Sequence, residues 1–371
     1  METLYNVDAS YYGAKIRSYL QYKRIPFNEV LGDREVFSSK ILPTVGWPVI
    51  PVILTELGET LQDTSDMIDH YEIVYAEKSV LPLMAPGRAL SYWLELIGDE
   101  WLKLPALHYR WRYNRDFVVR EMGRNNDPSA PAAEQLRVGK KIAKTFQDWC
   151  PIHGITEHTS ASIETEYLEF LRLFEKHLAA FPYLLGSQPS LGDFAFFGPL
   201  YAHLYRDPVS GDLMRQAAPR VSNWVIRMNS FNSQRPTEEG DWVDFEAIPD
   251  TLTHLLNHLS RDFVPVIVAE VQALQLWLQN SNDVIMPRYF GDVNFVLGTD
   301  RPHEVSEKRK LTTYGQWMLQ RVLNVLKSSG DTERKKITRL FSCFGASSVL
   351  DITIPVKLGK RNFELVRDIE F

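Results

Sequence analysis

The segment that most limits the possible folds is WPVIPVILTELGETLQDTSDMIDHYE, residues 47–72. Its apolar part, VIPVILTE, predicts a strand. After a turn at Gly58, the polar cluster opens a helix from about Thr64 to Ala76. Because proline cannot donate a ladder hydrogen bond, Pro51 must lie at the start or edge of that strand, where a cis peptide bond is one compatible arrangement.

The N-terminal residues predict an α/β unit around this segment. TLYNV at residues 3–7 indicates a strand, Gly13 to Lys23 a helix, and FNEVL a second strand. The order is therefore βαβ followed by ββα. Because EKSVLPLMAPGRA carries prolines and breaks the pattern, we predict that the first domain covers residues 1–80.

Helical periodicity dominates the next part of the chain and predicts an all-α second domain over residues 86–232. Apolar residues recur there at spacings of three and four: Ile163, Tyr167, Phe170, Leu171, Phe174 and Leu178. NSQRPTEEGDW is typical of a linker. Residues 240–371 are predicted to form an extension with helices at 249–280 and in YGQWMLQRVLNVL, closed by a β-hairpin that turns at Gly359.

Composition excludes several classes of function. The net charge is -6 and basic residues are scattered, so we expect no nucleic-acid partner. No apolar run is long enough to span a membrane, and the first residues do not have the pattern of a signal peptide. The two cysteines, Cys150 and Cys343, lack metal-type spacing and are expected to be free thiols, so we predict a cytoplasmic protein without a metal site.

Three places could bind a peptide-like ligand. The main chain of Ile50, before Pro51, could pair with an extended ligand, although an ordinary edge-strand proline gives the same sequence. Asp63 and Thr64 stand at a helix start, where a carboxylate and an ammonium group could both be held, or where they could simply cap the helix. Ser10 precedes the first helix, and its hydroxyl could stabilise a thiolate or serve only as a cap.

Taken together, these pieces resemble the cytosolic glutathione transferase family. LYNVDASYYGAKIRSYLQYKRIPFNEV resembles its opening strand, catalytic loop, helix and second strand, and VIPVI is similar to its segment with a cis proline. LQDTSDMIDHYE resembles the start of the helix that follows. YLLGSQPSLGDFAFFGPLYAHL is similar to a helix start in its second domain, where Ser190 and Asp193 predict a capping box, and APRVSNWVIRM is similar to the closing helix with a buried Trp224.

The resemblance covers residues 1–230 and implies a thioredoxin-like N-terminal domain, an all-helical second domain and a glutathione site. By position it implies that Ser10 is the catalytic serine, that Ile50 and Pro51 bind the cysteinyl unit, and that Asp63 with Thr64 binds the γ-glutamyl end. Asn6, and not Tyr5, occupies the place of the catalytic tyrosine of other classes. The family usually forms a homodimer through its N-terminal domain, and the extension could change that contact.

Two departures from the family pattern affect the predicted site. Asp63 and Thr64 replace a Glu-Ser pair, which shortens the carboxylate arm, and two tyrosines follow Ser10. Serine cannot form the mixed disulfide that thiol transferases of this fold use. The predicted reaction is therefore attack of the glutathione thiolate on a small electrophile. The alternatives are a non-catalytic binding or assembly protein of the same fold, and an isomerase or lyase that uses glutathione as a cofactor.

LPALHYRWRYNRDFVVR is predicted to form the first long helix of the second domain and could supply the acceptor site. Tyr109, Arg112 and Tyr113 could line a pocket in which Arg112 favours acidic or polarised electrophiles, but a solvated, partly stacked helix face is the simpler interpretation. The extension is expected to pack on the transferase body. A dimer contact and a cover over the acceptor site remain open as alternatives for it.

Overall fold

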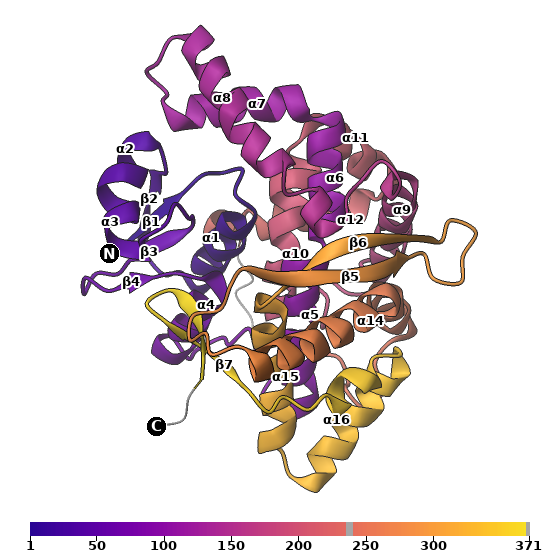
Figure 1. Ribbon diagram of the computed structural model, residues 1–371. Coiled ribbons are helices and arrows are strands. Elements are labelled where there is room, and N and C mark those ends of the chain that lie inside the picture. The colour runs from indigo at the N-terminus through magenta and orange to yellow at the C-terminus, as the bar shows by residue number, and fades with distance from the viewer. Residues whose placement is uncertain (235–239, 369–371) are drawn as a thin grey trace. The chain divides into compact units, whose positions relative to one another are not determined.

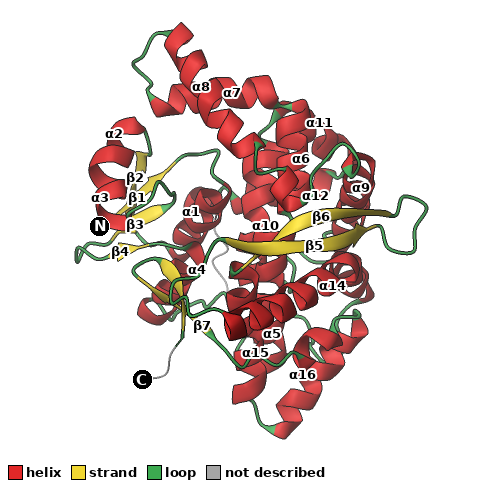
Figure 2. Cartoon of the chain, in the orientation of Figure 1, coloured by secondary structure: helices red, strands yellow, loops and turns green. Residues whose placement is uncertain are grey.

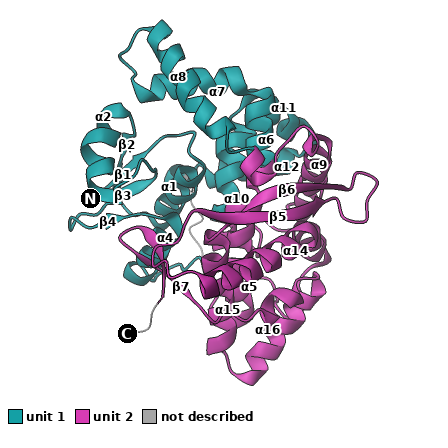
Figure 3. Cartoon of the chain, viewed as in Figure 1, with its two compact units in different colours: residues 1–80, 105–150, 194–239 teal, residues 81–104, 151–193, 240–371 magenta. Residues whose placement is uncertain are grey.

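The computed structural model describes residues 1–234 and 240–368. These residues form two compact units, shown in different colours in Figure 3. Unit 1 comprises residues 1–80, 105–150 and 194–239, and unit 2 comprises residues 81–104, 151–193 and 240–371. The predicted domains, residues 1–80, 86–232 and 240–371, are each one continuous segment, whereas each compact unit combines three separate segments. The predicted division therefore stays a prediction.

Unit 1 contains a thioredoxin-like sheet with helices. Its strands are β1 (Glu2–Asn6), β2 (Phe27–Leu31), β3 (Val52–Leu54) and β4 (Thr60–Leu61), in the order β2-β1-β3-β4. β2 is parallel to β1, whereas β3 is antiparallel to both β1 and β4. The associated helices are α1 (Tyr11–Lys23), α2 (Arg34–Val36), η1 (Phe37–Ile41), α3 (Leu42–Val45) and α4 (Thr64–Val74) (Figure 1). The predicted βαβ and ββα order is confirmed.

The rest of unit 1 is helical. Its elements are α6 (Lys103–Tyr113), α7 (Arg115–Asn126), α8 (Ala132–Gln147), α10 (Leu191–Pro199), η4 (Leu200–Tyr205), α11 (Pro208–Ala217), α12 (Pro219–Met228) and α13 (Phe231–Gln234). The first residues of α6 and of α10 belong to unit 2, and the rest of each helix belongs to unit 1. Helix α1 joins them through an aromatic core in which Phe194 lies 5.6 Å from Tyr19 and 5.7 Å from Tyr22, between ring centroids. Trp224 is fully buried, as predicted.

Unit 2 combines helices with two hairpins, each a separate two-stranded sheet. Figure 2 colours the helices and strands of the chain differently. Its elements are α5 (Ala85–Leu96), η2 (Ile97–Trp101), η3 (Pro151–His153), α9 (Ser160–His177), α14 (Asp250–Asn280), β5 (Tyr289–Leu297), β6 (Val305–Thr312), α15 (Tyr314–Ser328), α16 (Asp331–Cys343), η5 (Ser347–Asp351), β7 (Leu358–Arg361) and β8 (Glu364–Arg367). The predicted capping box is present: the Ser190 N–H and hydroxyl donate to Asp193 Oδ2 at 2.8 and 2.7 Å.

Three sequence predictions need correction. The helix that contains Tyr109 is not the first after the sheet, because α5 precedes it, and it ends at Tyr113 before α7 begins. The C-terminal hairpin turns at Asn362 and Phe363, which have positive φ, while Gly359 lies inside β7 opposite Val366. The hairpin β5–β6 was missed in the sequence altogether. Part of the predicted linker, residues 235–239, lies outside the described residues.

Within the described residues, no helix is both long and apolar enough to cross a membrane. Both cysteines are free thiols, as predicted; Cys343 is exposed and Cys150 is half-buried.

Candidate functional site

Pro51 lies immediately before the third strand, at the kind of position that its sequence predicts. The Ile50–Pro51 peptide bond is cis, and strand β3 begins with the next residue, Val52, which pairs with Tyr5 of β1. Strand β3 lies between β1 and β4, so Pro51 precedes an interior strand and is not part of its ladder. The Ile50 main chain therefore stands at the end of the sheet, beyond its last paired residue.

The start of helix α4 carries the acidic and hydroxyl residues. Asp63 is the N-cap, and its Oδ1 accepts a hydrogen bond from the Ser65 N–H at 2.8 Å. The capping alternative is therefore present in the structure. A carboxylate can accept several hydrogen bonds, so this cap does not exhaust the acceptor capacity of Asp63. Thr64 is 3% exposed, so its hydroxyl is much less accessible to a ligand than the sequence suggested.

Ser10 occupies the N-cap of helix α1 and is half-buried. Its Oγ accepts a hydrogen bond from the Gly13 N–H at 3.1 Å, so here too the capping alternative is present. A hydroxyl that accepts one hydrogen bond still has its own proton to donate. The helix N-terminus adds a positive electrostatic potential next to that proton, which favours a nearby anion such as a thiolate.

Asn6 closes the space between strand β1 and helix α1. Its side chain is buried, and Nδ2 donates to Glu29 Oε1 at 2.8 Å. A Cβ atom on Gly13 would lie 1.7 Å from Asn6 Oδ1, so only glycine permits this approach. Asn6, which the family resemblance places where other classes have a catalytic tyrosine, thus packs inside the domain.

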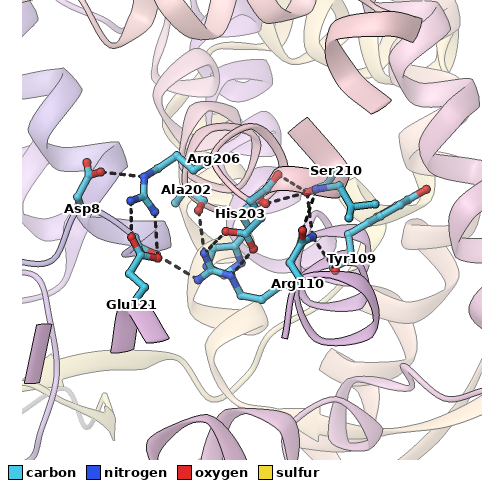
Figure 4. A network of polar contacts seen from close by, with 12 residues as sticks. Asp8, Tyr109, Arg110, Glu121, Ala202, His203, Arg206 and Ser210 are labelled. Atoms are coloured by element: carbon cyan, nitrogen blue, oxygen red, sulfur yellow. Dashed lines mark hydrogen bonds and ion pairs between the residues drawn. The ribbon is translucent and has the colours of Figure 1, made fainter. Parts of the chain in front are cut away.

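The carboxylate of Asp8 fixes the loop that carries Ser10, and sequence reasoning missed it. It accepts hydrogen bonds from Arg17 Nη1 at 2.6 Å and from the Tyr201 hydroxyl at 2.9 Å. It also forms an ion pair with Arg206 Nε at 2.8 Å, which Figure 4 shows. Burial acts to raise the pKa of Asp8, but the positive charges of Arg206 and Arg17 outweigh it and hold the pKa below its ordinary value. Asp8 is therefore a stable anion at neutral pH.

Arg110 holds the same loop from helix α6. Its guanidinium binds both carboxylate oxygens of Asp207 at 2.8 Å, and it also donates to the carbonyl oxygens of Ala202 at 2.9 Å and Ala9 at 3.3 Å. Burial raises the pKa of Asp207, against the effect of Arg110. Because Ala9 directly precedes Ser10, contacts from α1, η4 and α6 all converge on the two residues before it.

His203 lies in the same polar network and is neutral. Burial, followed by the positive charges of Arg110 and Arg206, holds the pKa of His203 far below its usual range. Its ring meets the Tyr11 ring edge-on, with centroids 5.6 Å apart. A base with so low a pKa does not take up a proton at neutral pH, so His203 packs against Tyr11 and is not a candidate acid.

The three predicted acceptor-site residues lie together on α6 but differ in exposure. Tyr109 is 4% exposed and Tyr113 is 42% exposed, with their ring centroids 5.7 Å apart. The exposed Arg112 places Cζ 5.8 Å from the Tyr113 centroid. This arrangement contains the stacked helix face that the sequence also allowed. The sequence analysis did not single out Arg110. Its position four residues after the buried Ala106 places it on the buried face of the helix, and this spacing could have indicated its role.

No group of three or more histidine, cysteine, aspartate or glutamate side chains in the described part of the chain is arranged to hold a metal ion.

Comparison with family models agrees with this fold. The model described as glutathione S-transferase, N-terminal domain, matches residues 4–79, and the model described as glutathione S-transferase, C-terminal domain, matches residues 156–227. The chain belongs to the glutathione S-transferase family. Residues from about 230 to 371 lie beyond both family domains. Among curated proteins no match is found.

Several solved structures are similar to part of the chain at low identity. The beta-etherase LigF from Sphingobium sp. strain SYK-6 is 16% identical, with 62% of this chain and 95% of that one covered and a TM-score of 0.46. A glutathione S-transferase of Ceriporiopsis subvermispora in complex with glutathione is 15% identical, with coverages of 64% and 99% and a TM-score of 0.43. One from Rhodospirillum rubrum is 19% identical, with coverages of 69% and 99% and a TM-score of 0.36.

Proposed function

We propose that this glutathione S-transferase binds glutathione in its N-terminal domain and uses Ser10 to activate the thiol for attack on a small electrophile. The observation that carries the proposal is the N-terminal family domain with three features in unit 1: a hydroxyl at the start of α1, a cis proline before β3 and a carboxylate at the start of α4. We propose that Ile50 and Pro51 contact the cysteinyl unit and that Asp63 and Thr64 contact the γ-glutamyl end.

The chemistry follows from what the Ser10 hydroxyl can do. It donates a hydrogen bond to the glutathione sulfur, which favours the thiolate and lowers the thiol pKa. The thiolate then forms a sulfur–carbon bond with the electrophile, and either the leaving group departs or a proton is added to the adduct. Serine itself forms no covalent intermediate in this scheme. The network around Asp8 and Arg110 supports it, since a preorganised hydroxyl is more effective than a mobile one.

The acceptor side of the proposal involves Tyr109, Arg112 and Tyr113. The exposed Tyr113, with the buried Tyr109 packed beside it, offers an aromatic surface, and the exposed Arg112 favours an electrophile with an acidic or polarised group. A cytoplasmic location and a homodimer complete the proposal. The two free cysteines are compatible with a reducing compartment.

The test is glutathione binding by titration calorimetry, followed by conjugation to a generic aromatic electrophile. We expect Ser10→Ala to keep most of the binding and lose about a hundredfold in turnover, because an activating hydrogen bond contributes on that scale. Asp63→Ala should lose binding. Two matched controls are available in the same domain: Ser38→Ala removes a surface hydroxyl, and Asp33→Ala removes the cap of α2, whose Oδ1 accepts from the Val36 N–H.

The outcomes separate the alternatives. Loss of binding in Asp63→Ala but not in Asp33→Ala would distinguish ligand contact from mere capping. A folded protein that binds no glutathione would overturn the proposal in favour of a binding or assembly protein of this fold. If glutathione is bound but recovered unchanged while the second substrate is rearranged or cleaved, product analysis would indicate an isomerase or lyase.

A further inference from the structure

A cavity in unit 2 is lined only by residues of the C-terminal extension. Its walls are helix α16 and residues 245–253, which lead into helix α14 and form its first turn. Figure 3 draws these elements in the colour of unit 2. The cavity has a volume of about 570 Å³. Small ligands occupy cavities of about 300–1,000 Å³, so this one has the size of a ligand site.

One face of α16 supplies the positive charges of this cavity. Lys335 and Arg339 line it four residues apart, so their side chains are neighbours on the helix surface. Both are exposed, and neither side chain has an ion pair or hydrogen bond with another residue that the structure describes. Lys336, in contrast, pairs with Glu246 at 2.9 Å and with Glu333 at 3.1 Å. Two cations of the wall are therefore available to a ligand.

The acidic residues of the lining do not balance its cations. Glu246 is paired with Lys336, so these two charges offset each other. Asp250 is exposed in the first turn of α14, where the helix dipole stabilises its carboxylate. Three cations and two carboxylates in the lining leave one positive charge. The chain as a whole has a net charge of -6, so the cavity has the opposite sign and matches a ligand with one negative charge.

The cavity also has an apolar wall. Phe245 and Leu340, each 2% exposed, line it together with the half-buried Ile248. The ring of Phe245 packs closely on helix α5, where a Cβ atom on Gly87 would lie 2.4 Å from Phe245 Cε2. This close packing fixes the apolar wall before any ligand binds. A ligand that fills the cavity therefore needs an apolar part as well as a charge.

We propose that this cavity binds a small organic monoanion in which a carboxylate is joined to an apolar group. The guanidinium of Arg339 donates parallel hydrogen bonds to the carboxylate, and Lys335 adds a second charge-assisted contact. The apolar group contacts Ile248, Phe245 and Leu340. Because exposed charges contribute little affinity on their own, binding requires both the charge and the apolar contact.

Cys343 provides a local measure of occupancy. It is an exposed thiol that lines the cavity, whereas Cys150, the other thiol, is half-buried in unit 1. The full chain is alkylated with iodoacetamide at constant ionic strength, and mass spectrometry follows the two thiols separately. Phenylbutyrate is the probe, phenylbutanol keeps its apolar group without the charge, and acetate keeps the charge without the apolar group. We expect phenylbutyrate alone to protect Cys343 saturably and to leave Cys150 unaffected.

Three variants test the charges, each compared by the phenylbutyrate concentration that gives half of the protection. Arg339→Ala should bind at least about tenfold more weakly, which is the scale of one charge-assisted contact. It keeps the main-chain oxygen that accepts from Cys343 Sγ at 3.2 Å. Arg361→Ala is the matched control, because it removes an exposed guanidinium of unit 2 that does not line the cavity. Asp250→Asn should bind about two- to fivefold more tightly, since it removes a like charge.

Four results would overturn the proposal. Phenylbutyrate could fail to protect Cys343, or phenylbutanol or acetate could protect it equally well. Arg339→Ala could bind as the Arg361→Ala control does, or Asp250→Asn could bind more weakly than the wild type. Lys335→Ala repeats the charge test if Arg339→Ala does not fold. The readout lies in unit 2 and involves no residue of the proposed glutathione site, so its outcome is independent of glutathione binding.

Discussion

The carboxylate of Asp8, which lies two residues before Ser10, accepts a hydrogen bond from Arg17 Nη1 at 2.6 Å. Together with the contacts of Tyr201 and Arg206, this fixes the loop from which Ser10 enters helix α1. The position of the Ser10 hydroxyl thus depends on a carboxylate that contacts no part of the proposed ligand site.

Asp8→Asn should therefore lower turnover with little effect on glutathione affinity. The amide keeps the shape of the side chain but weakens two charge-assisted contacts, and a small displacement of the Ser10 hydroxyl reduces the rate. We expect kcat to fall about tenfold while KM for glutathione changes by less than about twofold. Steady-state kinetics on the folded variant provides the measurement.

The control for this prediction is Asp212→Asn, which weakens an exposed ion pair with Arg215 in the same unit. Its kinetics should match those of the wild type. If Asp8→Asn raises KM for glutathione as much as it lowers kcat, Asp8 shapes the binding site and does not merely position Ser10.

Gly13→Ala should destabilise the protein, although alanine is usually favoured over glycine in a helix. The added Cβ would lie 1.7 Å from Asn6 Oδ1, inside a packed region. Overpacking of this kind costs about 1–3 kcal/mol of the free energy of unfolding, which denaturant titration would detect.

Two further variants test the cause. The double variant Asn6→Ala with Gly13→Ala should recover part of the loss, because it removes the atom that clashes. Gly330→Ala serves as the control, since no atom lies within 4 Å of the Cβ position there. A Gly13→Ala variant as stable as the wild type would mean that Asn6 moves aside at no cost.

The buried ion pair between Arg110 and Asp207 gives a third prediction. Asp207→Ala should cost about 3–5 kcal/mol in the free energy of unfolding, because it leaves the buried guanidinium unpaired. Asp212→Ala breaks an exposed pair and should cost less than about 1 kcal/mol. Urea titration of both variants provides the comparison.

The double variant Arg110→Met with Asp207→Leu separates the ion pair from the buried charge. It should recover much of the stability lost in Asp207→Ala, because no unpaired charge remains. If the double variant is less stable than Asp207→Ala, the hydrogen bonds of Arg110 to Ala9 and Ala202 contribute more than the charge does.

The N-terminal sheet could be predicted from the sequence because local signals agree there. The proline before β3, the cap residues Ser10 and Asp63 and the alternating apolar residues all favour the same elements. The capping box of Ser190 and Asp193 could be predicted for the same reason, since both partners are three residues apart.

The network around Ser10 could not be predicted because its partners are distant in the sequence. Asp8 contacts Tyr201 and Arg206, which are almost two hundred positions later, and no local pattern relates them. The sequence analysis predicted a role for the exposed Arg112 because it stands among aromatic residues. Arg110, two positions earlier, is instead the arginine that binds the loop of Ser10, through the carbonyl oxygen of Ala9. Spacing along one helix indicates a shared face but not what that face contacts.

The hairpin β5–β6 was missed because its strands are poor in the usual signals. Half of the residues of VSEKRKLT in β6 are charged, and only Arg309, Leu311 and Thr312 within it are buried. In the C-terminal hairpin the glycine misled the prediction of the turn, because Asn362 supplies the positive φ that the turn requires and leaves Gly359 in the strand.

Glu270 should make the stability of the protein decrease as the pH rises. Burial raises its pKa from 4.5 to about 7 in the folded protein, so the folded state holds a proton that the unfolded state releases between these values. The stabilisation by this proton is complete below pH 4.5 and is lost as the pH rises through about 7.

Glu270→Gln keeps an acceptor for the Thr312 hydroxyl without the charge. In phosphate-free buffer at about pH 8 it should therefore exceed the wild type by up to about 3 kcal/mol in the free energy of unfolding, with the difference vanishing in mild acid. Urea titration across this range provides the test, with the exposed Glu304→Gln as control. A difference independent of pH would show that packing, and not the charge of Glu270, distinguishes the two proteins.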